Sequence, residues 1–222
     1  GGFNVISTIA YPSGKTSNFS YTSIQFLDAN NASYSIPAIS DLYYLDQGNN
    51  LLSHYQYAYG TNSGGNTFTG YQGGYALSST SDGLLDSNNT LYQYNVEVRS
   101  MDAAGTIVAL TDTLYSFAHV PLTQNTYIID ASGTQQGFLQ LNSVYDVTPD
   151  KHSQQPNYLS PKQSEQLFFA SASANGVPQN KRAYQYDYFG NTTSKQSSSY
   201  EQASESYTMD TVETASYYTA AG

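Results

Sequence analysis

The residues with the clearest chemical meaning are four asparagines that stand two positions before a Ser or Thr, with no proline between. This pattern is the acceptor for N-linked glycans, and all four copies lie in polar or turn-like surroundings, where a sugar would not disturb a core. They are Asn18, Asn31, Asn88 and Asn191. We expect several of them to be glycosylated.

No arrangement of His, Ser, Asp or Glu matches a known catalytic or metal-binding motif. The three histidines, His54, His119 and His152, are far apart and lack the His-Glu-x-x-His context of zinc enzymes. Glu97 and Arg99 share the polar side of one strand-like run and are expected to form a solvated ion pair. The sequence therefore predicts a protein that is not an enzyme, with no catalytic residue, no metal and no cofactor.

Composition limits the partners and the compartment. The 222 residues carry a net charge of −10, only 11% are charged, and Cys is absent. An acidic chain repels nucleic-acid phosphates, and no run approaches the ~18 apolar residues of a membrane-spanning helix. A Gly-Gly start without Met predicts a mature product after removal of a signal peptide. A surface of hydroxyls and amides loses few ion pairs in acid, so we expect an extracellular and acid-tolerant protein.

The elements that carry these residues are predicted to be strands, and the plan is clearest in residues 90–117. Tyr92, Tyr94, Val96 and Val98 alternate with polar residues, which is the period of two expected of a strand. A second apolar run, 107–117, follows the turn residues 102–105. This pattern predicts a long antiparallel hairpin at the centre of a sheet.

Further strand-like runs occur throughout the chain, and no internal repeat is evident. They cover 18–26, 33–44 (interrupted by Pro37), 51–59, 125–130, 137–145, 183–189 and 206–218. Ser160, Pro161 and Gln163 resemble a helix start, and Gly176 a helix end. Residues 191–199 are expected to be a solvated loop. The fold class predicted is all-β, an antiparallel immunoglobulin-like or pilin-like β-sandwich with at most one short helix.

The N-terminal segment reads as a separable strand. Alternate residues on one face are mostly apolar, and Pro12 and Gly14 then break the strand and provide a hinge. The residues of this face are Phe3, Val5, Ser7, Ile9 and Tyr11. Two interpretations remain open: the first strand of the chain's own sheet, or a donor strand that completes the sheet of a neighbouring copy. The second divides the chain into 1–14, donor strand and hinge, and 15–222, the head domain.

With this N-terminal strand, the sequons, the absence of Cys and the Tyr/Ser/Thr/Asn-rich body, the chain resembles subunits of crenarchaeal extracellular filaments called threads. Thread subunits are similar in architecture to type I pilins and, like them, polymerise by donor-strand complementation. The thread subunits are also heavily N-glycosylated. The resemblance implies a structural subunit of a pilus-like surface appendage, with a role in adhesion or biofilm. Its partners would be identical subunits in a helical homopolymer, and other cells or surfaces. Bacterial pilins of this type commonly carry a disulfide, which this chain lacks, and archaeal bundling pilins are a nearby alternative.

Two other classes of protein remain open. One is a secreted carbohydrate-binding or adhesive β-sandwich that works as a monomer, with tyrosine stripes such as Tyr55, Tyr57 and Tyr59 as stacking platforms. The other is an acid-active secreted hydrolase with a carboxyl as its general base, for which the candidates are Glu97, Glu201 and Glu205.

Overall fold

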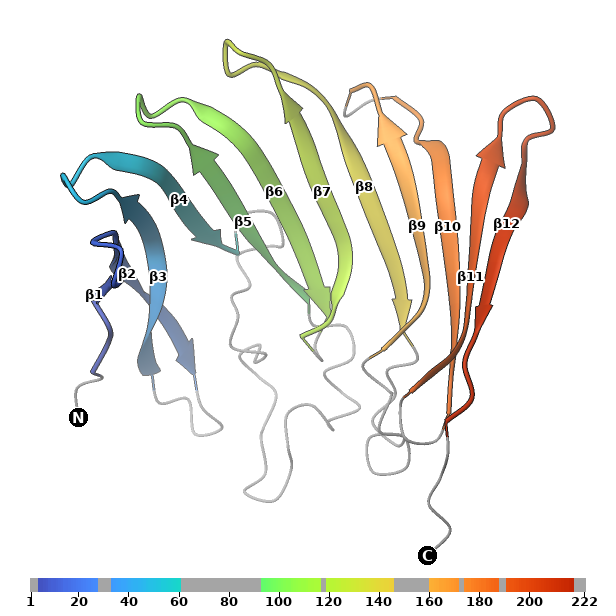
Figure 1. Cartoon of the computed structure of the whole chain (residues 1–222), viewed down its shortest axis with the longest axis horizontal. Helices are drawn as coiled ribbons and strands as arrows, with labels where there is room; N and C mark the ends of the chain where they lie inside the picture. The colour runs from blue at the N-terminus through green and yellow to red at the C-terminus, as the bar shows by residue number, and fades with distance from the viewer. Residues whose placement is uncertain are drawn as a thin grey trace, which may run out of the picture.

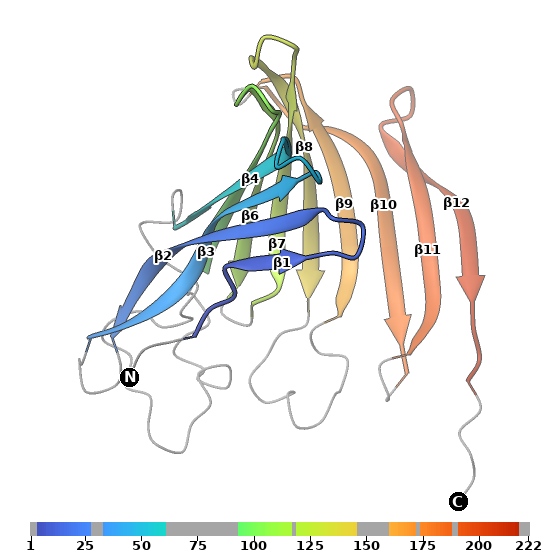
Figure 2. The same cartoon turned by 60° about the vertical axis from the view of Figure 1, so that its left-hand side comes forward.

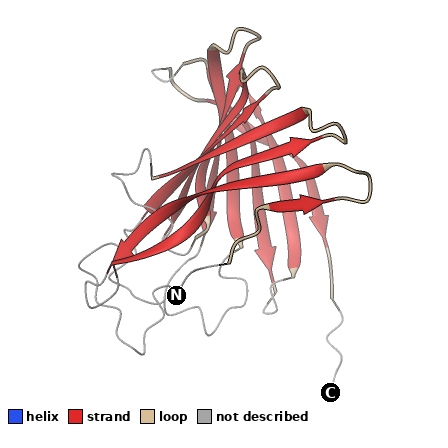
Figure 3. Ribbon diagram, turned by 90° about the vertical axis from the view of Figure 1, so that its left-hand side faces the viewer, coloured by secondary structure: helices blue, strands red, loops and turns tan. Residues whose placement is uncertain are grey.

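The computed structural model describes residues 4–27, 33–60, 93–116, 119–145, 160–171, 174–187 and 191–217. These residues form twelve strands and no helix (Figure 3). The strands are β1 (Thr8–Ala10), β2 (Thr16–Leu27), β3 (Ser33–Leu45), β4 (Leu51–Tyr59), β5 (Gln93–Met101), β6 (Ile107–Ser116), β7 (Pro121–Ile129), β8 (Gln135–Tyr145), β9 (Pro161–Phe169), β10 (Val177–Tyr186), β11 (Thr192–Glu201) and β12 (Ser206–Thr214). In this described part of the chain, no helix has the length and apolarity that crossing a membrane requires.

All twelve strands belong to one antiparallel sheet in which each strand pairs with its neighbours in the sequence, from β1 to β12 (Figure 1). The sheet is strongly twisted, so that β1 to β3 run across the direction of β9 to β12 (Figure 2). The predicted all-β antiparallel class is confirmed. The fold is consistent with the predicted sandwich-like character, although the described strands belong to one continuous sheet that is not closed, because each strand pairs with the strands that precede and follow it in the sequence.

Five of the hairpin loops share one design. In five loops the first residue's N–H donates to the fifth residue's carbonyl, the fourth residue's N–H donates back to the first residue's carbonyl, and the fourth residue has a positive φ. This is the three-residue hairpin loop that ends in a left-handed residue. The loops are 11–15, 46–50, 102–106, 116–120 and 130–134, with Gly14, Asn49, Gly105, His119 and Gly133 at the left-handed position.

Two expectations about secondary structure are wrong. The helix expected to start at Ser160 is strand β9, and the loop expected at 191–199 is strand β11. Each lies between two strands that already present open edges, so the gain in backbone hydrogen bonding overrides local propensity. Pro37 does not divide β3, which continues through it opposite Ser23.

The central hairpin is confirmed, but its polar face is not simply wet. Tyr94 and Asn95 lie on opposite faces of β5, yet each is only 1% exposed. On the face of Asn95, polar side chains of neighbouring strands lie in a row we call the polar ladder, in which Asn95 bonds to Asp112, Thr123 to Asn142, Gln140 to Asn125, and Asn142 to Gln140. On the other face Tyr94 stacks on Tyr115, with ring centroids 5.1 Å apart. Both faces of this single layer are therefore held by side-chain pairs, each adding a modest stabilisation.

Candidate functional site

The predicted donor strand lies at one edge of the chain's own sheet. Phe3 is outside the described residues, Val5 and Ser7 precede β1, and Ile9 is its central residue. Three residue pairs join β1 to β2, with Ile9 opposite Ser17, and Ser7 adds one backbone bond through its carbonyl. All residues from 4 to 11 are exposed. The Tyr21 hydroxyl also donates to the Ile6 carbonyl at 2.6 Å, and the Tyr11 hydroxyl lies 3.1 Å from that of Ser17. A short strand pairing and a few hydrogen bonds therefore hold the segment to its own chain.

The predicted hinge is a well-defined turn in this arrangement. Pro12 and Gly14 belong to the 11–15 loop, in which the Gly14 N–H donates to the Tyr11 carbonyl at 2.9 Å. The φ of Gly14 is +79°, a value that favours glycine. The Gln47 side chain donates to the Ser13 carbonyl and so links this loop to the 46–50 loop.

The opposite edge of the sheet is β12, which sequence reasoning did not single out. Among the described residues no strand pairs with its outer side, and Met209 and Val212 are 59% and 47% exposed. The two acidic residues of β12 bond to the neighbouring strand β11: Asp210 accepts a hydrogen bond from Ser199, and Glu213 accepts one from Lys195 at 3.0 Å. The outer side of β12 thus combines open backbone groups with apolar side chains.

The glycan acceptors have unequal surroundings. Asn18 is half-buried within β2, opposite Thr8 on one side and Tyr43 on the other. Asn191 is half-buried at the β10–β11 turn, where its side-chain amide donates to the Asp187 carboxylate at 2.9 Å. Asn31 and Asn88 lie outside the described residues. A glycan at Asn191 would replace one amide N–H and so alter this bond.

The candidate acids are not brought together. Glu201 and Glu205 flank the β11–β12 turn and are exposed, whereas Glu97 lies on β5, six strand positions away from β11. The sheet register instead sets Glu97 opposite Asp112, a residue that sequence reasoning missed because only the register reveals it.

Both of these carboxylates have structural partners. Glu97 Oε1 lies 2.5 Å from Nη2 of Arg99, although it accepts no well-aligned hydrogen bond, and Asp112 accepts from Asn95 at 2.8 Å. Burial is the main cause that raises the pKa of Tyr127, and the negative charges of Asp112 and, to a smaller extent, Glu97 raise it further. Tyr127, Asp112 and Glu97 therefore lie near one another on the sheet. The side-chain arrangement is a bonded polar row on a sheet face.

The two histidines that the structure describes also have structural partners. His54 stacks on Tyr43 and shares a 2.8 Å hydrogen bond with Asp41, while Tyr94 and His119 share a 3.0 Å hydrogen bond. Burial lowers the pKa of His119. His152 is outside the described residues, and among those described no three His, Asp or Glu side chains gather closely enough to hold a metal ion.

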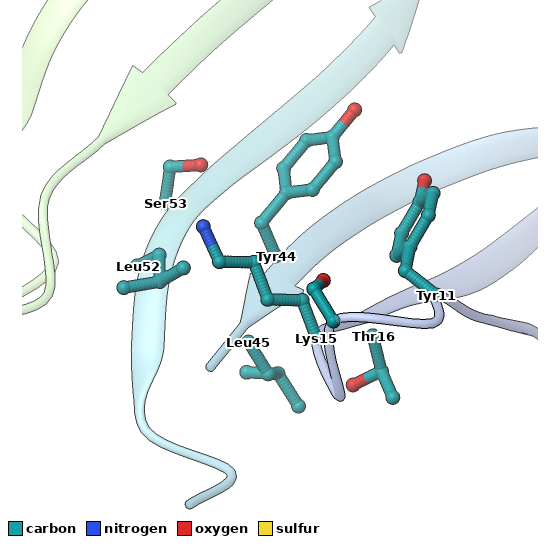
Figure 4. A pocket seen from close by; sticks show the side chains of 8 residues that line it. Tyr11, Lys15, Thr16, Tyr44, Leu45, Leu52 and Ser53 are labelled. Atoms are coloured by element: carbon teal, nitrogen blue, oxygen red, sulfur yellow. The ribbon is translucent and has the colours of Figure 1, made fainter. Parts of the chain in front are cut away.

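A pocket of about 390 Å³ lies beside the N-terminal turn, between the 11–15 loop and the β3–β4 hairpin (Figure 4). Its wall includes two tyrosine rings, leucine side chains, hydroxyls and one ammonium group. The residues that line it include Tyr11, Lys15, Tyr44, Leu45, Leu52 and Ser53. A second hollow, near β10 to β12, includes Tyr184, Lys195, Glu213 and Tyr217.

Comparison of the chain with protein-family models gave no match, and its comparison with curated proteins gave none either. The function must therefore be argued from the two open edges and the pocket.

Proposed function

We propose that this protein is a structural subunit of an extracellular filament, in which the N-terminal segment of one copy pairs with the edge strand of the next. The observation that carries the proposal is the placement of the two open edges, β1 and β12, at opposite ends of one sheet (Figure 1). Different edges that pair head to tail form an open chain rather than a closed dimer. The resemblance to thread and pilin subunits points to the same class of assembly.

The two edges differ in a way that favours exchange. β1 is held by three pairs to β2, whereas β12 offers nine residues, Ser206–Thr214, to a new strand. A donor segment of residues 3–11 would make more backbone bonds on β12 than β1 makes at home. Because the described strands form one sheet that is not closed, the proposed acceptor is its open edge at β12.

The side chains along the two segments are compatible. Residues 3–11 contain no charged group, and the acidic residues of β12 are already bonded to β11. Val5 and Ile9, which are 45% and 38% exposed in the single chain, would meet Met209 and Val212. Burying a large apolar side chain is worth ~1.5–3 kcal/mol when complete, so a few such contacts with a backbone ladder give a long-lived joint.

The four sequons and the low content of charged residues support an extracellular setting. Glycans at Asn18, Asn31, Asn88 and Asn191 would supply solvation that charge usually provides, and would suit a surface appendage that mediates adhesion or biofilm formation. The chain needs no catalytic group, metal or cofactor for this role.

The test uses one variant at each edge. Val5→Asp, in the donor segment, and Val212→Lys, in β12, should each fold as monomers and fail to form filaments, as seen by size-exclusion chromatography with light scattering and by negative-stain microscopy. Val108→Asp, at a 54% exposed position on the interior strand β6, is the matched control and should still polymerise.

Mixing the two variants gives the sharper result. The Val5→Asp copy keeps an intact β12 and the Val212→Lys copy keeps an intact donor segment, so together they should form a one-to-one heterodimer and nothing longer. Polymerisation by either single variant, or a wild-type protein that stays monomeric at every concentration, would refute the proposal.

A further inference from the structure

We propose that the pocket beside the N-terminal turn binds a carboxylated sugar, a pyranose that bears a carboxylate, such as a uronic acid. The pocket lies within a single chain and does not depend on filament formation. Its volume of about 390 Å³ is in the range of small-molecule sites.

The walls of the pocket suit the two kinds of surface on a sugar ring. Tyr11 and Tyr44, 42% and 36% exposed, present aromatic rings to which the C–H face of a pyranose can pack. Leu45 and Leu52 extend the apolar floor, and Ser53 is one of the hydroxyl groups at the rim. Ring hydroxyls of the sugar would hydrogen-bond to these polar groups.

The charge in the pocket selects an acidic ligand. Lys15 is the one charged side chain in its lining, and Figure 4 shows it extending across the opening toward Leu52 and Ser53, beside the ring of Tyr44. Among the described residues no carboxylate lies within ion-pair distance of Lys15. The Asp46 carboxylate accepts hydrogen bonds from the Gly48 backbone and from Asn50 in its own turn, and these bonds lower its pKa more than the charge of Lys15 does. The ammonium group is therefore available to a ligand carboxylate.

The second hollow supplies an internal comparison. It also contains tyrosine rings and a lysine, but there Lys195 lies 3.0 Å from the Glu213 carboxylate. A carboxylated ligand would have to displace Glu213, which makes this hollow a poor competitor for the same sugar.

The experiment is a titration followed by NMR and calorimetry, with glucuronic acid and a glucuronic-acid oligomer as acidic probes and glucose and its matched oligomer as neutral probes. The Val5→Asp protein serves as the background, because it is expected to be monomeric and retains Tyr11. We expect the acidic probes to bind at least fivefold more tightly than the neutral probes, and the preference to fall as salt increases.

Variants assign the preference to its residues. Lys15→Met keeps most of the aliphatic stem and should make acidic and neutral probes bind equally, whereas the matched variant Lys195→Met should leave the preference unchanged. Tyr11→Ser should weaken both kinds of probe, and thermal unfolding verifies that each variant is folded. Equal binding of acidic and neutral probes to the parent, no binding of any probe at millimolar concentration, or an unchanged preference in Lys15→Met would each overturn the proposal. If filaments fail to form while the acidic sugar binds, only the proposed filament function is refuted.

Discussion

Replacement of Gly105 by Ala should destabilise the protein by about 1 kcal/mol, through backbone strain alone. Gly105 has a φ of +82°, and a Cβ atom built on it would meet no atom within 4 Å. An L-residue with a side chain loses ~1–2 kcal/mol in the left-handed region, and the lower entropy of the unfolded alanine chain, which favours folding by ~0.4–1 kcal/mol, offsets only part of this loss. For a chain of this length that corresponds to a decrease in Tm of about 2–4 °C.

Two further substitutions separate strain from crowding. Gly105→Asn should stay within a few tenths of a kcal/mol of the wild type, because Asn tolerates this conformation and Asn49 occupies the same loop position at φ 61°. Gly137→Ala should cost more than Gly105→Ala, since its Cβ would lie 2.5 Å from the Phe169 carbonyl oxygen while φ is +146°.

Urea unfolding of the Val5→Asp monomer, followed by tyrosine fluorescence and circular dichroism, measures all three variants. A Gly105→Ala protein as stable as its parent would show that φ at this position is not fixed by the hairpin. An Asn variant as unstable as the Ala variant would show that the loss does not arise from left-handed strain.

Three other predictions follow from particular contacts. Asp130 accepts hydrogen bonds from Ser132 and Thr134, which lower its pKa to about 2, so its contribution to stability is complete above pH ~4 and is lost as the pH falls through about 2. When the free energy of urea unfolding is measured against pH, Asp130→Asn should show a smaller loss of stability in acid than the parent, and an equal loss would contradict this prediction. Phe138→Ala should lower the free energy of unfolding by ~3–5 kcal/mol in the same assay, because the Phe138 ring is 8% exposed and stacks on Phe169 with ring centroids 4.6 Å apart. Val144→Ala, at a 53% exposed position on the same strand, should lower it by less than ~1 kcal/mol. Tyr11 would leave its own pocket if residues 3–11 paired with another copy, so saturating glucuronic acid should slow filament growth monitored by light scattering, while glucose at the same concentration should not. Equal growth with both sugars would show that the pocket and the donor segment are independent.

Local sequence determines most of the strands and turns of this protein. Alternation in 90–117 indicates β5 and β6, and the three tyrosines of 51–59 share a face, opposite Val96, Val98 and Ser100 of β5. Two of the five loops also share a sequence pattern, Asp-x-x-Gly-Thr, at 102–106 and 130–134. The strands between these loops differ in composition, so the recurring loop does not form a sequence repeat.

The tertiary structure alone decides what those hairpins build. The same alternation serves a two-layer sandwich and a single sheet, and only the pairing of each strand with both sequence neighbours selects the single sheet with open edges at β1 and β12. Likewise, β9 and β11 are strands because their neighbours offer backbone partners, which overrides the capping pattern at Ser160 and the polar composition of 191–199. The register sets Glu97 opposite Asp112, and folding brings Lys15 between Tyr11 and Leu52, since such neighbours depend on long-range pairing that no local pattern of residues encodes.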